Sequence, residues 1–290
     1  MAKPDHIELP TGERIAILYE DRSVIAIDKP RNWMLVPFSW QKTNRNLQAA
    51  LTSSIAAGDF WARSRGLRFL RFVHRLDADT TGILLLAKSQ GAVTSYGALF
   101  ESREMEKTYL AVVEGVPKQM EWTCRLKLGP DVNHRGKMKV DARRGKDAET
   151  KFRVLQSREK TALIEAHPLT GRTHQIRVHL AESGHAVVGD DLYGSMAEDK
   201  TSGKRERESE KTLERVEELR RNAHTSLKQG VNERNAQSRQ LPLPSRKTLP
   251  YLGLRAVALA YVDPFTRRRI AIRAPIEDFV REYGFEIPKI

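Results

Sequence analysis

The chain contains one cysteine, Cys124, among its 290 residues. A single cysteine cannot form an internal disulfide, and it rules out a zinc site built from several cysteines. So little cysteine is typical of proteins from a reducing compartment, and we expect the protein in the cytoplasm.

Long apolar runs are also missing. No stretch approaches the ~18 apolar residues that a membrane-spanning helix needs. Residues 1–6 include lysine, proline and aspartate where an export signal would have its apolar core. We therefore expect no association with a membrane.

Acidic residues are outnumbered by basic ones, 37 to 50, which gives a formal net charge of +13. Such a field attracts polyanions and speeds their encounter with the protein. Nucleic acid is the first candidate partner, and an acidic membrane surface is the second. A length of 290 residues with 40% hydrophobic residues is ample for a sizeable core.

Apolar spacing and turn residues predict alternating short strands and helices. The first helix should begin after Asn46 and stop at Gly58, while a later one should be capped by Thr173 and closed by Gly184. We expect helices at 46–57, 91–103 and 173–182, paired strands at 15–19 and 23–28, further strands at 108–113, 150–155 and 161–166, and a closing hairpin at 254–262 and 269–273.

The domain organisation follows from composition. Residues 1–14 are polar and form a loosely ordered lead-in, and residues 15–290 form a single domain. Mixed charges with few large apolar residues mark an insertion at about 196–247, which we expect to be flexible. Within it, the sequence predicts a solvated helix at residues 209–221 and disorder at residues 222–240. The insertion either binds nucleic acid or is a flexible loop, and mixed charge runs favour the loop.

Residues 73–88, VHRLDADTTGILLLAK, place an arginine and an aspartate just before an apolar run. The run 83–87 is typical of a fully buried strand. Catalytic carboxylates are common just before a buried strand of this kind, which makes Asp77 the candidate catalytic residue. A structural ion pair between Arg75 and Asp77 is the competing interpretation, and Asp79 is a competing carboxylate.

A second polar motif spans residues 167–180, HPLTGRTHQIRVHL. Gly171 allows a turn into a helix, so Arg172 would project where helix N-termini favour anions. Other donors suited to phosphate or a polar ring are His174, Gln175 and Arg177. A metal site at His174, His179 and His185 is disfavoured, because the HExxH spacing is absent and the neighbours are cationic.

With KTYLA at 107–111 and GDDLYG at 189–194, these motifs resemble, in order, those of the RluA family of RNA pseudouridine synthases, of the ribosomal and transfer RNA type. The resemblance covers residues 15–194 and the C-terminal strands. It implies an α+β fold with a central mixed, mainly antiparallel sheet, flanking helices and an active-site cleft. It implies an isomerase that detaches uracil from C1′ of its ribose, turns it over and rejoins it through C5, without cofactor or metal.

The resemblance also implies residue roles. Asp77 is the catalytic nucleophile or base and pairs with Arg172. Tyr109 lies against the target base, Ile176 packs beside it and Lys107 lines the pocket. The implied substrate-binding set is His74, Arg75, Lys107, Tyr109, Arg172, Thr173, Gln175, Ile176 and Arg177.

The expected partner is ribosomal or transfer RNA, bound by a monomer with the target base flipped out. The segment before Ile15 is too short for the S4-like domain of many relatives, so RNA affinity should come from the rest of the chain. Arg255 replaces a common histidine, and Arg31-Asn32-Trp33 departs from the usual small-Gly turn. Candidate phosphate contacts are Arg63, Arg65, Arg68, Arg71, Arg143, Arg144 and Lys146.

Two rival functions remain open. A catalytically dead RNA-binding relative would keep the basic surface without the reaction. A glycoside-hydrolase-like enzyme would need a second carboxylate at a set distance, where this motif supplies an arginine.

Overall fold

The computed structural model describes residues 2–9, 11–35, 45–194 and 251–288. The insertion expected at about 196–247 lies outside these residues, as do the helix and the disorder predicted within it. None of the described helices is both long and apolar enough to span a membrane.

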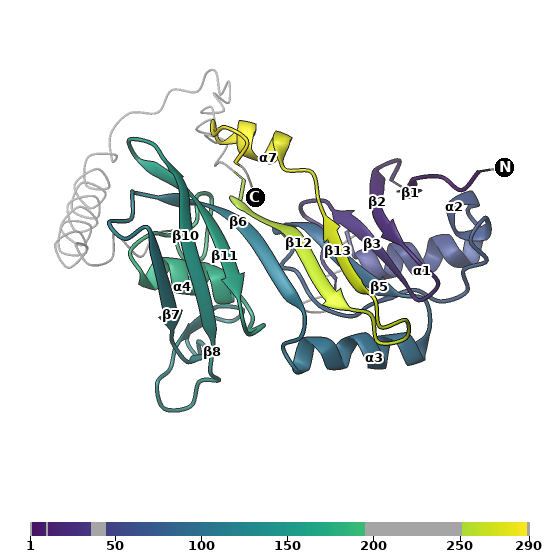
Figure 1. The fold of residues 1–290 in the computed structure, drawn as a ribbon, viewed down its shortest axis with the longest axis horizontal. Helices are drawn as coiled ribbons and strands as arrows, with labels where there is room; N and C mark the ends of the chain where they lie inside the picture. The colour runs from purple at the N-terminus through teal and green to yellow at the C-terminus, as the bar shows by residue number, and fades with distance from the viewer. Residues whose placement is uncertain (1, 10, 36–44, 195–250, 289–290) are drawn as a thin grey trace, which may run out of the picture. The chain divides into compact units, whose positions relative to one another are not determined.

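One large sheet organises the described residues, and five helices pack around it (Figure 1). Its strands are β1 (His6–Glu8), β2 (Arg14–Glu20), β3 (Val24–Lys29), β4 (Arg71–Phe72), β5 (Thr81–Ala87), β6 (Glu106–Glu114), β7 (Glu121–Arg125), β10 (Glu149–Ser157), β11 (Thr161–Pro168), β12 (Leu254–Val262) and β13 (Arg269–Arg273). A small second sheet pairs β8 (Leu128–Pro130) with β9 (Met138–Val140). The helices are α1 (Leu47–Ala57), α2 (Phe60–Arg63), α3 (Gln90–Glu101), α4 (Gln175–Glu182) and α7 (Glu277–Glu282).

The main sheet runs in the order β1-β2-β3-β5-β12-β6-β11-β10-β7, with β4 added to β5 and β13 to β12. Every pairing is antiparallel except that of β5 with β12, which is parallel. The expected α+β fold with a mixed, mainly antiparallel sheet is therefore confirmed. The predicted strand pair and closing hairpin are confirmed as β2–β3 and β12–β13.

Helices cover both faces of this sheet. On one face α1 packs over β3 and β5, and α4 packs over β6 and β11. On the other face α3 and α7 cover the corresponding halves. Tyr109 on β6 contacts the core beneath α1 and the core beneath α4, so it marks the seam between them.

Local signals in the sequence explain several boundaries. The Asn46 side chain accepts a hydrogen bond from Ala49 N at 3.1 Å, and Gly58 ends α1 with φ 73°. All residues of β5 are buried, as predicted for the run 83–87. The expectation of a loose lead-in fails for residues 6–8, because β1 pairs with β2 and Ile7 is fully buried.

The start of α4 differs from the prediction. The helix begins at Gln175, and His174 before it has a left-handed backbone with φ 54°. No side chain caps the helix, so the capping role predicted for Thr173 is wrong. A left-handed residue without glycine gives no clear sequence signal, which is why the helix was predicted two residues too early.

Two departures from the family pattern have a structural explanation. Asn32 has φ 62°, a conformation that glycine adopts freely and asparagine tolerates better than most residues, so asparagine suits this turn. Arg255 on β12 forms two hydrogen bonds to the Asp28 carboxylate, at 3.0 and 2.7 Å, and a third to Pro275 O. This arginine therefore ties β12 to β3 across β5.

Glycine is required where β5 meets β12. Gly82 has φ 103°, and a Cβ at this position would lie 2.0 Å from Ala256 O. Neither the backbone angle nor the space permits a larger residue. The strand that follows the HRLD motif is thus held directly against the C-terminal strand.

Candidate active site

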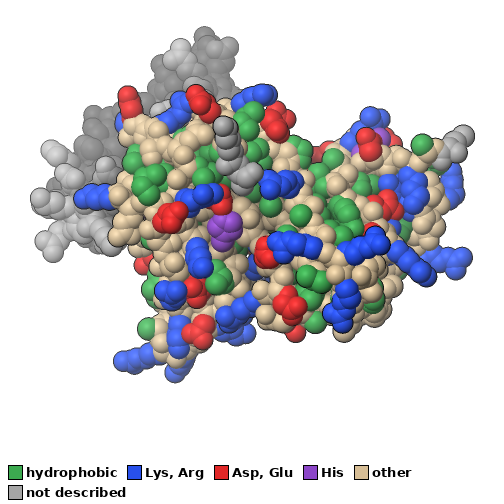
Figure 2. All heavy atoms as spheres, in the orientation of Figure 1, with side chains coloured by type: hydrophobic (Ala, Val, Ile, Leu, Met, Phe, Trp, Pro, Cys, Tyr) green, Lys and Arg blue, Asp and Glu red, His purple; other side chains and the backbone are tan. Residues whose placement is uncertain are grey.

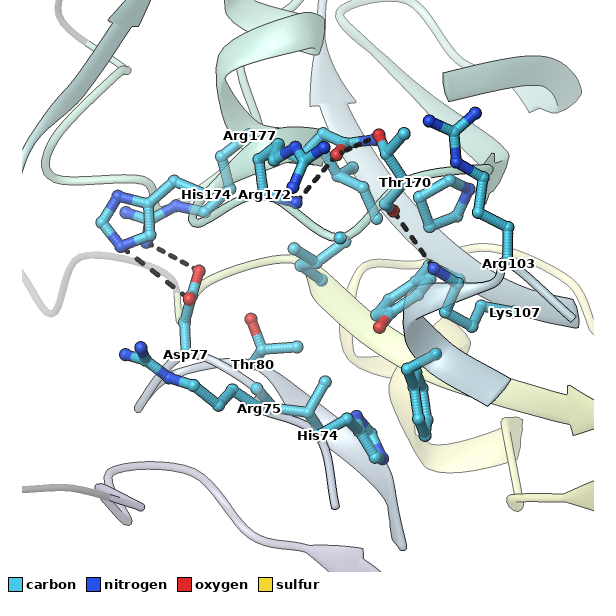
Figure 3. Close-up of a pocket in the computed structure, with 18 of the residues that line it drawn as sticks. His74, Arg75, Asp77, Thr80, Arg103, Lys107, Thr170, Arg172, His174 and Arg177 are labelled. Carbon is cyan, nitrogen blue, oxygen red and sulfur yellow. Dashed lines mark hydrogen bonds and ion pairs between the residues drawn. The ribbon is translucent and has the colours of Figure 1, made fainter. Parts of the chain in front are cut away.

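A pocket with a volume of about 420 Å³ opens at the seam of the sheet (Figure 3). Its walls come from the segment between β4 and β5, the end of α3, β6, and the segment leading from β11 into α4. Leu254 of β12 completes the lining. The volume lies in the range of small-ligand sites.

Asp77 enters the pocket from the segment before β5. Its side chain is 27% exposed, and its Oδ2 accepts a hydrogen bond from Arg177 Nη1 at 3.2 Å. His174 Nε2 lies 3.8 Å from Oδ1. The carboxylate is therefore oriented by Arg177, and His174 of the same motif lies beside it, as Figure 3 shows.

Arg177 is fixed from behind by Asp190. Its Nε and Nη2 each donate to this carboxylate at 2.7 Å, and the Asp190 side chain is fully buried. Burial alone lowers the pKa of Arg177, but Asp190 and Asp77 outweigh it and raise the pKa above the usual arginine range. The guanidinium therefore presents a permanent, fixed charge to Asp77.

The structure corrects the pairing expected for Asp77. Arg172 does not contact this carboxylate; its Nε donates to Asp147 O at 2.9 Å. Arg177, five residues later, forms the contact instead. Because α4 begins only after the left-handed His174, Arg177 lies in its first turn and points at Asp77, while Arg172 stays in the preceding loop.

Lys29 supports the segment that carries Asp77. It is fully buried, and its Nζ donates to Pro30 O at 3.0 Å, Ala78 O at 2.6 Å and Thr80 O at 3.0 Å. Burial lowers the pKa of Lys29 to about 8, while Asp79 and Asp77 oppose this effect. The buried Lys29 ammonium thus connects the end of β3 to two backbone carbonyls of the turn that follows Asp77.

Tyr109 and Lys107 extend from β6 into the pocket. Burial, with a contribution from Asp77, raises the pKa of Tyr109, so its hydroxyl stays protonated. Lys107 Nζ donates to Thr170 O at 3.1 Å. Burial and then Arg103 lower the pKa of Lys107 to about 8.

The two residues before Leu76 have different surroundings. His74 Nε2 accepts a hydrogen bond from Leu85 N at 3.1 Å, and its ring stacks on Phe100 at 4.6 Å. Burial, followed by Lys107, lowers its pKa to about 3, so the ring is neutral. Arg75 is exposed and pairs with no carboxylate in the described part of the chain, so the competing ion pair with Asp77 is absent there.

Three residues of the second motif are used differently. The Gln175 amide accepts from Thr170 Oγ1 and Arg172 N and donates to Glu149 O and Thr150 Oγ1. Its hydrogen-bonding groups are thus occupied in holding the loop. Ile176 lines the pocket, whereas Thr173 is exposed and lies outside the lining.

Several residues of the site were missed by the sequence interpretation. Lys29 and Arg103 were given no role, and Asp190 appeared only as part of a motif. Asp190 could have been found from its position in the GDDLYG motif. Lys29 could not, because a buried lysine beneath a loop has no local sequence pattern.

The basic side chains predicted to contact phosphates come from two separate segments of the chain, 63–71 and 143–146. On the face drawn in Figure 2, lysine and arginine side chains are scattered among acidic and apolar ones. Arg65 donates hydrogen bonds from Nε to the Glu20 carboxylate at 2.8 Å and from Nη2 to Pro4 O. Arg63, Arg68 and Arg71 are exposed. Within the described ranges no cluster of three or more histidine, cysteine or acidic residues is arranged to hold a metal ion.

Residues 23–182, more than half of the chain, match the family model described as RNA pseudouridylate synthase. The dual-specificity RNA pseudouridine synthase RluA of Vibrio cholerae is 35% identical over 184 residues, which are 63% of this chain and 70% of that protein. The ribosomal large subunit pseudouridine synthase C of Vibrio parahaemolyticus is 41% identical over 137 residues, 47% of this chain and 42% of that relative.

A solved structure, human RNA pseudouridylate synthase domain containing 4, shares the fold with a TM-score of 0.62 and 21% identity, covering 94% of each chain. The predicted resemblance is thereby confirmed. The chain belongs to the RluA-type RNA pseudouridylate synthases, isomerases that convert uridine in RNA into pseudouridine.

Proposed function

We propose that the chain isomerises specific uridines of ribosomal or transfer RNA and that Asp77 carries the reaction. The observation behind this proposal is one carboxylate, oriented by a buried arginine, in a pocket whose wall holds the Tyr109 ring. Arg177 places a fixed positive charge beside this carboxylate and aims it into the pocket, and both chemical routes require an aimed carboxylate.

The reaction breaks the C1′–N1 bond and forms a C1′–C5 bond. The C5 proton leaves and N1 gains a proton, so the product is an isomer and no oxidant or energy source is consumed. Asp77 acts either as a nucleophile at C1′, displaced again when C5 attacks, or as the base that takes and returns a proton of the sugar.

The remaining pocket residues have supporting roles in this proposal. Tyr109 provides a stacking face for the uracil, and its hydroxyl has no hydrogen-bond partner among the described residues. Ile176 packs against the base from α4. Arg75, exposed beside the pocket, contacts the RNA from which the nucleotide is extruded.

The test uses transcripts of ribosomal and transfer RNA labelled with tritium at C5 of uridine. Isomerisation releases tritium to water and leaves pseudouridine in the digest, whereas glycoside hydrolysis releases labelled uracil. Asp77→Asn should lower the rate by about 10²–10⁴-fold or more, with Asp79→Asn as the matched control. Free uracil, or full activity of Asp77→Asn, would overturn the proposal.

A further inference from the structure

Two cations stand at the end of the pocket remote from Asp77. Arg103 follows the end of α3, and Lys107 lies on β6; both line the cavity. Figure 3 shows them on the opposite side of the pocket from His174, Arg177 and Asp77.

No carboxylate of the described residues neutralises either cation. Among these residues, Lys107 Nζ donates only to a backbone carbonyl, Thr170 O. Arg103 has no hydrogen bond or ion pair within the described residues, and its charge lowers the pKa of Lys107. Glu101 also lines this end but is exposed and forms an ion pair with neither cation among those residues. Two like charges without a counter-ion create a place where an anion is strongly favoured.

The backbone of Arg103 reinforces this interpretation. Its φ of 65° lies in the left-handed region, which is unfavourable for a residue with a Cβ. Glycine would relieve this strain, yet the chain carries an arginine whose side chain reaches the pocket. Strained positions of this kind concentrate at ligand-binding sites.

The position of the cations fits a nucleotide. Lys107 and Tyr109 are two residues apart on β6, so their side chains lie on the same face, about 7 Å apart along the strand. Tyr109 is close enough to Asp77 for that carboxylate to raise its pKa. An anion at Lys107 would thus lie one sugar–phosphate unit from a base stacked on Tyr109.

We propose that Arg103 and Lys107 form a phosphate-binding subsite that holds a backbone phosphate of the target nucleotide while its sugar faces Asp77. The identity of the ligand as an RNA nucleotide rests on the proposed function. The phosphate is either the one on the 5′ side or the one on the 3′ side, and the probes below distinguish them.

The experiment follows the Lys107 ammonium by NMR while the full chain is titrated with uridine, uridine 5′-monophosphate or uridine 3′-monophosphate. One of the monophosphates should raise the Lys107 pKa and bind at least about tenfold more tightly than uridine. Arg103→Gly, which suits the left-handed backbone, should remove most of this preference. Arg281→Gln removes one exposed charge on α7 and is the matched control.

Equal binding of uridine and both monophosphates would overturn the subsite, as would an unchanged preference in Arg103→Gly. The binding readout needs no turnover. A phosphate preference without isomerisation of any RNA would therefore refute only the proposed function, whereas isomerisation without the preference would refute only the subsite.

Discussion

Asp190 and Arg177 are joined by two hydrogen bonds of 2.7 Å that water does not reach. The arginine that orients Asp77 is thus itself oriented by a second carboxylate. We expect Asp190→Asn to lower the rate at least about tenfold and to destabilise the fold by about 3–5 kcal/mol, because a buried charge loses its partner.

Single-turnover kinetics and denaturant unfolding measure these effects. Asp191→Asn is the control, since Asp191 is 75% exposed and 3.8 Å from Arg177. If both variants behaved alike, Asp190 would not be the residue that positions the arginine.

Arg177 and Arg172 should respond differently to substitution. Arg177→Lys keeps the charge but cannot donate to Asp190 and Asp77 together, so we expect kcat to fall by about 10²-fold or more. Arg172→Lys should retain kcat and change mainly KM, since Arg172 lines the pocket without contacting Asp77. A larger loss of kcat in Arg172→Lys would restore the pairing that the motif first indicated.

Lys29 should give the stability of the protein a distinct pH dependence. Its pKa is lowered to about 8 in the folded state, so between about pH 8 and 10.5 the unfolded chain binds more protons than the folded chain. The penalty for burying the charge is therefore complete below pH 8 and relieved as pH rises through this window.

Lys29→Met should make that rise smaller than in the unaltered protein, where Lys107 contributes a rise of the same sign. It should also lower activity, because the turn after Asp77 loses a donor to Ala78 O and Thr80 O. Unfolding free energies of both proteins at pH 7.5 and 10 test the first effect. Parallel pH profiles would show that Lys29 does not titrate as described.

Gly82→Ala should destabilise the protein by about 2–5 kcal/mol, because the new methyl group meets Ala256 O and the left-handed backbone adds strain. Gly97→Ala in α3 is the matched substitution, since no atom lies within 4 Å of its added Cβ. It should stabilise the protein by up to about 1 kcal/mol. Thermal unfolding of both variants measures the contrast, and a mild Gly82→Ala would contradict the tight β5–β12 contact.

Much of the fold could be predicted from local patterns. Asn46 and Gly58 marked the ends of α1, and the apolar run after Gly82 marked the buried strand β5. The position of β12 between β5 and β6 could not be predicted, because the same apolar pattern suits any buried place in the sheet.

The site was less accessible to sequence reasoning. Motif order brought Asp77, Tyr109 and the second motif into one pocket, as the structure shows. Whether Arg172 or Arg177 contacts Asp77 depends on the left-handed backbone of His174. A histidine gives no sequence signal for this conformation. Lys29 and Arg103 act through three-dimensional proximity to distant segments, so they left no pattern along the chain.

The central place of β12 has a consequence for how the protein is made. Until residues 254–262 leave the ribosome, β5 and β6 have no strand between them, and the wall with Asp77 is not joined to the wall with Tyr109 and Arg177. The pocket therefore takes its final form only after this strand has been made. A nascent chain that still lacks β12 has both walls of the pocket but no strand that joins them.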